Sequence, residues 1–111
     1  MSSFQLSSTA TTAGRLERLA QLYRKRQASD LMTRTLDKLF LHEAAESRTQ
    51  LNQLQEDLTG FEHQYNLPSQ QFYRQYQNGE TDDRMDFVEW ASLFQMAADL
   101  QERLSLLTGE G

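Results

Sequence analysis

The stretch LNQLQEDLTGFEHQY, residues 51–65, decides the fold predicted for this chain of 111 residues. Its apolar side chains recur in alternating steps of three and four residues, which places them along one side of an α-helix. They are Leu51, Leu54, Leu58, Phe61 and Tyr65. A stripe of this kind is buried only when a second helix packs against it. We interpret it as the dimer seam of a homodimer.

The helix that carries this seam extends far toward the N-terminus. From Leu31 to Tyr65 there is no proline, and Gly60 is the single glycine. Ser29 or Asp30 is a suitable N-terminal cap. A continuous helix of about 36 residues would be about 54 Å long, whereas a compact domain of this size has a radius of gyration of about 13–14 Å. The helix must therefore kink or find a partner along its length.

Toward the C-terminus, the residues after 65 predict a corner and a returning helix. Pro68 disfavours helix before it, Ser69 is a suitable N-cap, and Gly79 is a suitable left-handed residue after a helix end. A short helix between them would carry Phe72, Tyr73 and Tyr76 near one side. A last helix runs to about Leu107 with its own apolar stripe, namely Phe87, Trp90, Ala91, Phe94, Ala97, Ala98, Leu104 and Leu107.

The N-terminal residues predict a tail and one more helix. Residues 1–12 are rich in Ser and Thr and offer little to bury, so we expect a mobile tail there. Thr12 would cap a helix over residues 13–27, and residues 13–108 would form a single helical domain. One proline and five glycines favour helix, because all-β chains need many turns. The expected class is all-α: a long helical hairpin or coiled coil with a short corner helix and an N-terminal helix, forming a dimeric bundle.

Composition excludes several classes of protein. The absence of cysteine removes disulfides, thiol catalysis and thiolate metal sites, and it fits a cytoplasmic location. No apolar run approaches the roughly 18 residues that span a bilayer, and the N-terminus lacks the features of a secretory signal. We expect no membrane partner.

Charge is distributed unevenly along the chain. Residues 15–38 hold seven cations against three acids, a net of +4, and residues 39–111 hold four arginines against thirteen acids, a net of −9. The basic residues Arg15, Arg18, Arg24, Lys25 and Arg26 could contact a nucleic-acid backbone. The preferred interpretation is solvated helix faces that differ in sign, and a basic rim that pairs with an acidic helix of a second subunit is favoured over nucleic-acid contact.

The stretch NGETDDRMDFVEW, residues 78–90, has two interpretations. In a calcium-responsive module of degenerate EF-hand type, Asn78–Glu89 would be the ion loop, but Asp83 stands where the loop requires glycine. In the alternative, Asp86 and Glu89 form a capping box, with Met85 and Trp90 as a hydrophobic staple. The second interpretation gives every residue a role without calcium.

No other chemistry has a recognisable pattern. His42 and Glu46, like His63 and Glu62, offer too few ligands for a metal site. There is no phosphate-binding glycine loop and no catalytic triad or carboxylate pair in a known surround. We therefore expect a protein that is not an enzyme and that uses no cofactor or metal.

The aromatic residues of the corner are either a core or a contact surface. Trp, Tyr and Arg dominate protein-binding hot spots, and several acids lie beside the aromatic residues. The residues predicted to bind a partner protein are Tyr73, Tyr76, Asp82, Asp83, Asp86, Phe87 and Trp90.

The segments FEHQY, SQQFYRQYQNGE and DDRMDFVEWASL resemble small, poorly characterised all-helical prokaryotic proteins, some of which resemble antitoxins of two-gene toxin–antitoxin modules. The resemblance covers residues 61–107. It implies an interaction protein rather than an enzyme. One concrete version of such a protein is an antitoxin-like neutraliser that would cover a basic active site with the acidic corner, residues 80–89, and its aromatic residues. The chain lacks an obvious DNA-binding fold at its N-terminus, which departs from common antitoxins.

Overall fold

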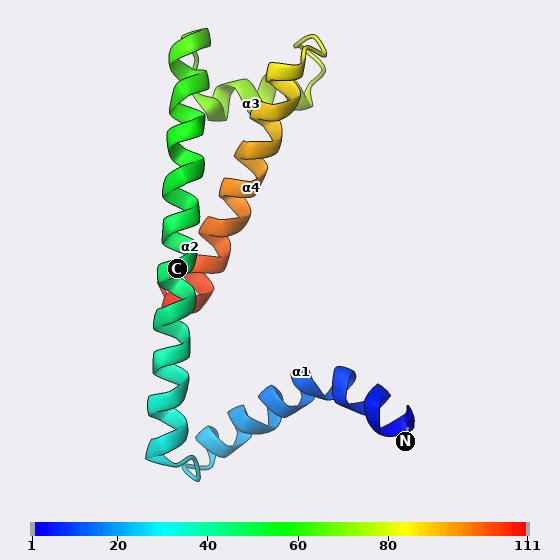
Figure 1. Ribbon diagram of the computed structural model, residues 1–111, viewed down its shortest axis with the longest axis vertical. Coiled ribbons are helices and arrows are strands. Elements are labelled where there is room, and N and C mark those ends of the chain that lie inside the picture. The colour runs from blue at the N-terminus through cyan, green and yellow to red at the C-terminus, as the bar shows by residue number, and fades with distance from the viewer. Residues whose placement is uncertain (1, 111) are drawn as a thin grey trace. The chain divides into compact units, whose positions relative to one another are not determined.

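The predicted all-α class is confirmed by the computed structural model, which describes residues 2–110, with side chains described for residues 11–110. Across residues 2–110 there are four helices and no strand: α1 (Ser2–Arg24), α2 (Asp30–Tyr65), α3 (Ser69–Gln77) and α4 (Met85–Thr108). Figure 1 shows their order. The chain forms two compact units, residues 1–38 and 39–111, and α2 runs from the first into the second.

In the first unit, α1 ends in a turn that leads into α2. Arg26 adopts a left-handed conformation, and the Gln27 amide donates to the Leu22 carbonyl, as in a Schellman helix end. The Ser29 Oγ accepts from the Met32 amide at 3.1 Å, so the predicted cap at Ser29 is confirmed.

The start of α1 differs from the prediction. The helix begins at Ser2 rather than at Ala13, so Thr12 lies inside it and does not cap it. The predicted mobile tail covers residues 1–12. The side chains of residues 1–10 lie outside the described part of the chain.

The helix α2 is continuous from Asp30 to Tyr65. It ends where Asn66 turns left-handed and the Leu67 amide donates to the Glu62 carbonyl. Pro68 follows and cannot continue the helix. The sequence left open whether this helix is kinked or continuous, and the structure shows one continuous helix.

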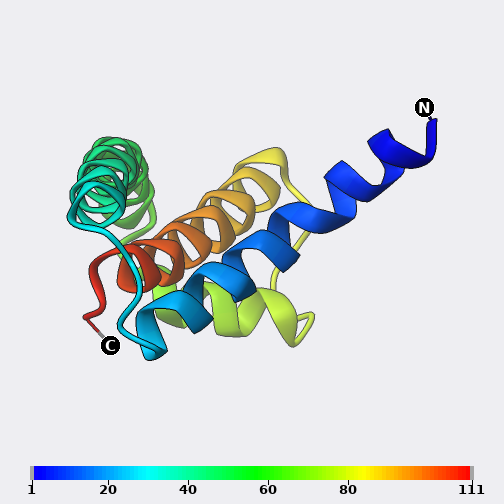
Figure 2. The ribbon, with the colours of Figure 1, turned by 90° about the horizontal axis from the view of Figure 1, so that it is seen from below.

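The second unit is a helical hairpin. The α4 residue Arg103 bonds to Glu43 and Ser47 of α2, whereas Trp90, near the start of α4, stacks on Phe61. The two helices are therefore antiparallel. Figure 1 shows α3 crossing the end of the pair where α2 and α4 lie furthest apart, and Figure 2 shows α3 and α4 on the same side of α2.

The predicted seam is buried within this one chain. Leu51, Leu54 and Leu58 are each less than a tenth exposed, and Phe61 and Tyr65 pack against the core cluster that contains Leu58 and Trp90. Burying a leucine side chain stabilises a fold by about 1.5–3 kcal/mol. The helix partner that the spacing requires is supplied by the same chain, and a homodimer through this seam stays a prediction.

The hairpin also buries a polar contact far from the corner. Ser47 is fully buried and accepts from an Arg103 guanidinium nitrogen at 3.1 Å. The other terminal nitrogen of Arg103 pairs with Glu43 at 2.6 Å. Buried polar groups need such partners, so Arg103 satisfies a hydroxyl that would otherwise be buried without a bond.

None of the helices in the described part of the chain is long and apolar enough to cross a membrane.

Candidate functional site

The candidate site is the corner where α2, α3 and α4 meet, together with the turn between α3 and α4. We call residues 79–84 the acidic turn, because it contains Glu80, Asp82 and Asp83. Its start is set by Gly79, which is left-handed with a φ of 73°. The Glu80 and Gly79 amides donate to the carbonyls of Gln75 and Tyr76, which completes a Schellman end for α3. The predicted role of Gly79 is confirmed.

Trp90 is the centre of the corner's core. Its side chain has no exposed surface, and the Phe72 ring stacks on it at 3.9 Å with an angle of 2° between the planes. Phe61 and Tyr65 stack on it at 5.5 Å and 5.7 Å. Trp90 is fully enclosed and lies beneath the exposed residues of the corner, and its predicted contact with a partner stays a prediction.

Ser69 is the polar partner of this tryptophan. The indole Nε1–H donates to the Ser69 Oγ at 2.9 Å, and Ser69 is itself buried. Ser69 was predicted to cap α3, but it is the first helical residue, and Pro68 holds the cap position. The Ser69 amide instead donates to a Glu62 carboxylate oxygen at 2.9 Å. The prediction was wrong because a carboxylate from α2, rather than the Ser69 side chain, satisfies the free amide at the start of α3.

The other predicted aromatic contacts are half-buried. Phe87 lies against Tyr65 and Phe72, and the Arg84 guanidinium lies 4.7 Å from its ring centre. Tyr76 packs on Phe72. The Tyr73 hydroxyl donates to Gln95 of α4 at 2.7 Å. These rings contribute to the core and keep part of their surface open to solvent.

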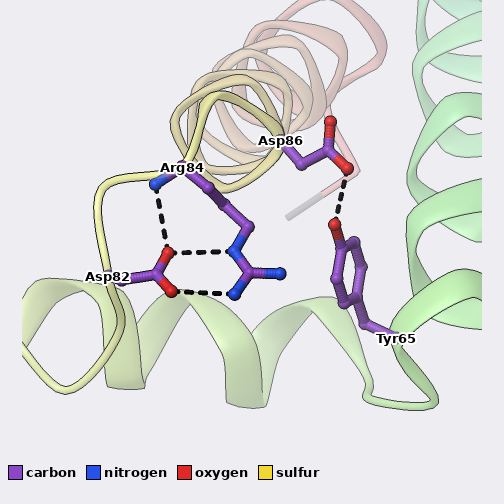
Figure 3. Close-up of polar contacts among 4 residues, drawn as sticks. All are labelled: Tyr65, Asp82, Arg84 and Asp86. Carbon is purple, nitrogen blue, oxygen red and sulfur yellow. Dashed lines mark hydrogen bonds and ion pairs between the residues drawn. The ribbon is translucent and has the colours of Figure 1, made fainter.

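Asp86 is tied to the end of α2 rather than to its own helix. The Tyr65 hydroxyl donates to the Asp86 carboxylate at 2.5 Å, as Figure 3 shows, and the Gln64 amide group donates to the same oxygen. The bond to Asp86 raises the pKa of Tyr65 above its ordinary value, because the carboxylate favours the protonated hydroxyl; burial acts in the same direction.

The predicted capping box and staple are therefore wrong. The helix begins one residue earlier, at Met85, with Arg84 in the cap position and no side-chain bond to the cap. Asp86 lies in the first turn, where its charge still favours the positive end of the helix dipole. Met85 is 77% exposed, so it does not pack on Trp90. Tertiary contacts of Asp86 with α2 replace the local pattern.

Asp82 and Arg84 form an ion pair that closes the acidic turn. Arg84 donates from Nε at 3.0 Å and from a terminal nitrogen at 2.8 Å to the two Asp82 oxygens (Figure 3), and its amide also donates to Asp82. Hydrogen bonds from Arg84 lower the pKa of Asp82 to about 2, and the pKa of Arg84 is raised in return. Asp83, next to the pair, is exposed.

These contacts do not assemble a calcium loop. Both oxygens of Asp82 bond to Arg84, and Asp86 bonds to Tyr65. Among the described residues, no group of three or more His, Asp or Glu side chains is placed to hold a metal ion. Asn78–Glu89 combines a helix end, a turn and the first turn of α4.

A titration tests the geometry of the acidic turn. We expect the Asp82 carboxyl to titrate near 2 rather than at its ordinary value of 3.8. Because the folded-state pKa is lowered, the contribution of the pair to stability is complete above 3.8 and is lost as the pH falls toward 2. Carboxyl carbon chemical shifts followed by NMR measure the midpoint. Arg84→Gln should return the Asp82 midpoint toward 3.8, whereas the control Arg74→Gln should leave the midpoint unchanged. A midpoint of 3.8 in the wild-type protein would contradict the Asp82–Arg84 pair.

The basic residues proposed for nucleic acid lie in the first unit, away from the corner in sequence. Arg15, Arg18 and Lys25 line one groove beside α1. Arg24 is the last residue of α1, and Arg26 is the left-handed residue of its end. The structure thus groups three of the five cations.

Sequence reasoning missed two exposed apolar side chains at the start of α4. Met85 is 77% exposed and Val88 is 41% exposed. It also missed Ser69 and Glu62 as supports of the corner. The spacing of Met85 and Val88, one helical turn apart, could have indicated a shared face, but only burial shows that this face is open.

Comparison of the chain with protein-family models, with curated proteins and with solved structures gives no match.

Proposed function

We propose that this chain is a non-enzymatic helical module that binds another protein through the acidic turn and the first turn of α4. The observation that carries the proposal is the exposure of Met85, 77%, on a helix start that the buried core holds in place. An apolar side chain open to water among carboxylates suits a contact with a partner better than a role in stability.

Rigidity of the corner supports this proposal. The turn begins at the Schellman end at Gly79 and ends at the first residue of α4, and within it Asp82 pairs with Arg84. Beneath it, Trp90 is stacked on Phe72. A surface held in one conformation loses little entropy when a partner binds, so more of the contact energy appears as affinity.

The chemistry of the surface suits a partner with a basic patch. Met85 and Val88 lie one turn apart on the same side of α4 and provide an apolar centre. Asp82, Asp83 and Glu89 are exposed around them. Binding sites commonly combine an apolar centre with a charged rim, in which complementary charge mainly sets specificity and association rate.

An antitoxin-like neutraliser is one concrete version of this function. In it the acidic turn would cover a basic active site of a toxic partner, with Met85 inserted at the centre. The resemblance of residues 61–107 to small helical prokaryotic proteins motivates this version, and the charge of the acidic turn agrees with it.

The test is affinity capture from the source cells followed by direct binding. The tagged wild-type protein captures candidates, which are identified by mass spectrometry and then purified. Met85→Ser combined with Val88→Ser should weaken binding of the true partner by at least about tenfold, the loss of about 1.4 kcal/mol. Asp83→Asn should slow association, because it removes charge from the rim.

A matched control separates a local contact from a general change of surface. Leu41 is 69% exposed and lies on α2, so Leu41→Ser removes a similar apolar area elsewhere. It should leave the affinity unchanged. Equal affinities of wild type and the Met85/Val88 double variant would contradict the proposed surface.

A further inference from the structure

A groove beside α1 combines cations with an apolar floor. It lies within the first unit, between one side of α1 and the start of α2. Its lining residues are Arg15, Arg18, Leu19, Gln21, Leu22, Lys25, Gln27 and Met32. Leu19, Leu22 and Met32 are half-buried, whereas the three cations are exposed.

The cations of this groove have no acid beside them. None of its described lining residues is acidic. Arg15, Arg18 and Lys25 form no ion pair within the part of the chain that the structure describes. Next to the groove, Leu16 is 57% exposed, which widens the apolar surface of α1. Within the described residues of the first unit, these three cations therefore have no anionic partner.

The outer side of α4 has the complementary composition. Met96 is 50% exposed and Leu106 is 81% exposed, and Asp99 and Glu102 lie exposed between them. These residues follow one another at helical spacing on the side of α4 that faces away from Trp90. Neither acid forms an ion pair in the described part of the chain. Asp99 accepts a hydrogen bond from the Gln95 amide group of the same helix at 3.1 Å, so what this α4 outer face (Met96, Asp99, Glu102 and Leu106) lacks among the described residues is a cationic partner.

The two surfaces match in length. Arg15 and Lys25 stand ten residues apart on α1, and Met96 and Leu106 stand ten residues apart on α4. At 1.5 Å per residue, each surface extends over about 15 Å. Arg15 and Arg18 are three residues apart, as are Asp99 and Glu102, so each of these two cations can lie opposite one acid.

We propose that the α1 groove binds the α4 outer face of a second copy of this chain, and that the same contact repeated in reverse closes a twofold dimer. Charge selects this occupant, because residues 15–38 carry a net +4 and residues 39–111 carry a net −9. A groove on one copy thus meets a face of opposite sign on the other. Reciprocal contacts form a closed pair rather than an open chain.

Reciprocity also accounts for stability. A single contact between two short helical surfaces is smaller than the roughly 1,200–2,000 Å² that stable complexes bury. Two symmetrical copies of it double the buried area without a new kind of contact. The contact involves neither the Leu51–Tyr65 seam nor the residues of the acidic turn.

Sedimentation velocity on the full chain tests the dimer. We expect wild type to dimerise and the dissociation constant to rise with salt, because the contact depends on exposed charges. A charge-reversed groove (Arg15→Glu, Arg18→Glu, Lys25→Glu) and a charge-reversed α4 face (Asp99→Lys, Glu102→Lys) should each raise the constant at least about tenfold. Glu and Lys are good helix formers, so both variants should keep their helix content by circular dichroism.

Mixing the two variants gives the decisive result. Each contact in the mixed dimer again joins opposite charges, so a one-to-one mixture should recover dimerisation. Arg34→Glu with Lys38→Glu, which alters charge in the same segment outside the groove, should leave wild-type dimerisation unchanged.

Three outcomes would overturn the proposal: a wild-type monomer at the highest attainable concentration, variants that dimerise normally, or a mixture that does not associate. If wild type is monomeric and binds a DNA duplex through Arg15, Arg18 and Lys25, the groove belongs to nucleic acid instead.

Discussion

Replacing Trp90 with alanine is expected to lower the free energy of unfolding by about 3–5 kcal/mol, the range for removing a buried aromatic ring. Trp90 is fully enclosed, and rings from two other helices stack on it. Its removal leaves a cavity where α2, α3 and α4 meet. It also leaves the buried Ser69 hydroxyl without its indole partner. Small domains are stable by only about 5–15 kcal/mol, so this substitution consumes a large part of the total.

Urea unfolding followed by circular dichroism measures the change. Val88→Ala, on the same helix at a partly exposed position, is the matched control and should change stability by about 0.5 kcal/mol or less. Ser69→Ala should cost an intermediate amount, about 1–3 kcal/mol, because it leaves the indole N–H buried without an acceptor. A Trp90→Ala protein as stable as Val88→Ala would show that the corner is not packed as described.

Replacing Leu54 with alanine is expected to lower the free energy of unfolding by about 2–5 kcal/mol without changing the state of association. Leu54 is 8% exposed within a single chain. Its loss therefore opens a cavity inside the hairpin rather than between two subunits. Denaturation curves measure stability, and sedimentation at concentrations where the variant is folded measures association.

This pair of measurements decides the role of the seam. Gln53→Ala, at the neighbouring exposed position, should alter neither quantity. A Leu54→Ala protein that keeps its stability but loses a wild-type dimer would restore the homodimer through Leu51, Leu54, Leu58, Phe61 and Tyr65. It would also count against the intramolecular packing of α4 on α2.

The ends of the helices show which structural features can be predicted from a local sequence pattern. Gly79 was identified as a left-handed helix end because a glycine there has no side chain to oppose that conformation. Ser29 was identified as a cap because a serine hydroxyl can accept a hydrogen bond from the backbone amide three residues later. Both roles depend only on neighbours in the chain. Ser69 and Asp86 matched the same kind of pattern, yet each bonds to a residue of another helix.

The candidate site was found in outline, but its exposed residues were not. The acids of the turn and the aromatic residues of the corner are adjacent in the sequence, so their grouping was foreseeable. Which of them faces water was not, because Trp90 and Met85 are both apolar residues beside acids. Three-dimensional packing encloses the first completely and leaves the second open.

The sequence alone determined the helical class, the corner at Pro68 and the spacing of the buried stripe, because each follows from backbone geometry and helical period. Only the tertiary structure decided what covers that stripe. A three–four spacing is equally satisfied by a second copy and by a returning helix of the same chain, since both offer the same apolar side chains. Which of the two covers the stripe depends on the direction that the turn between α3 and α4 gives to α4. In the structure α4 returns to cover α2, and Met85 and Val88 stay exposed.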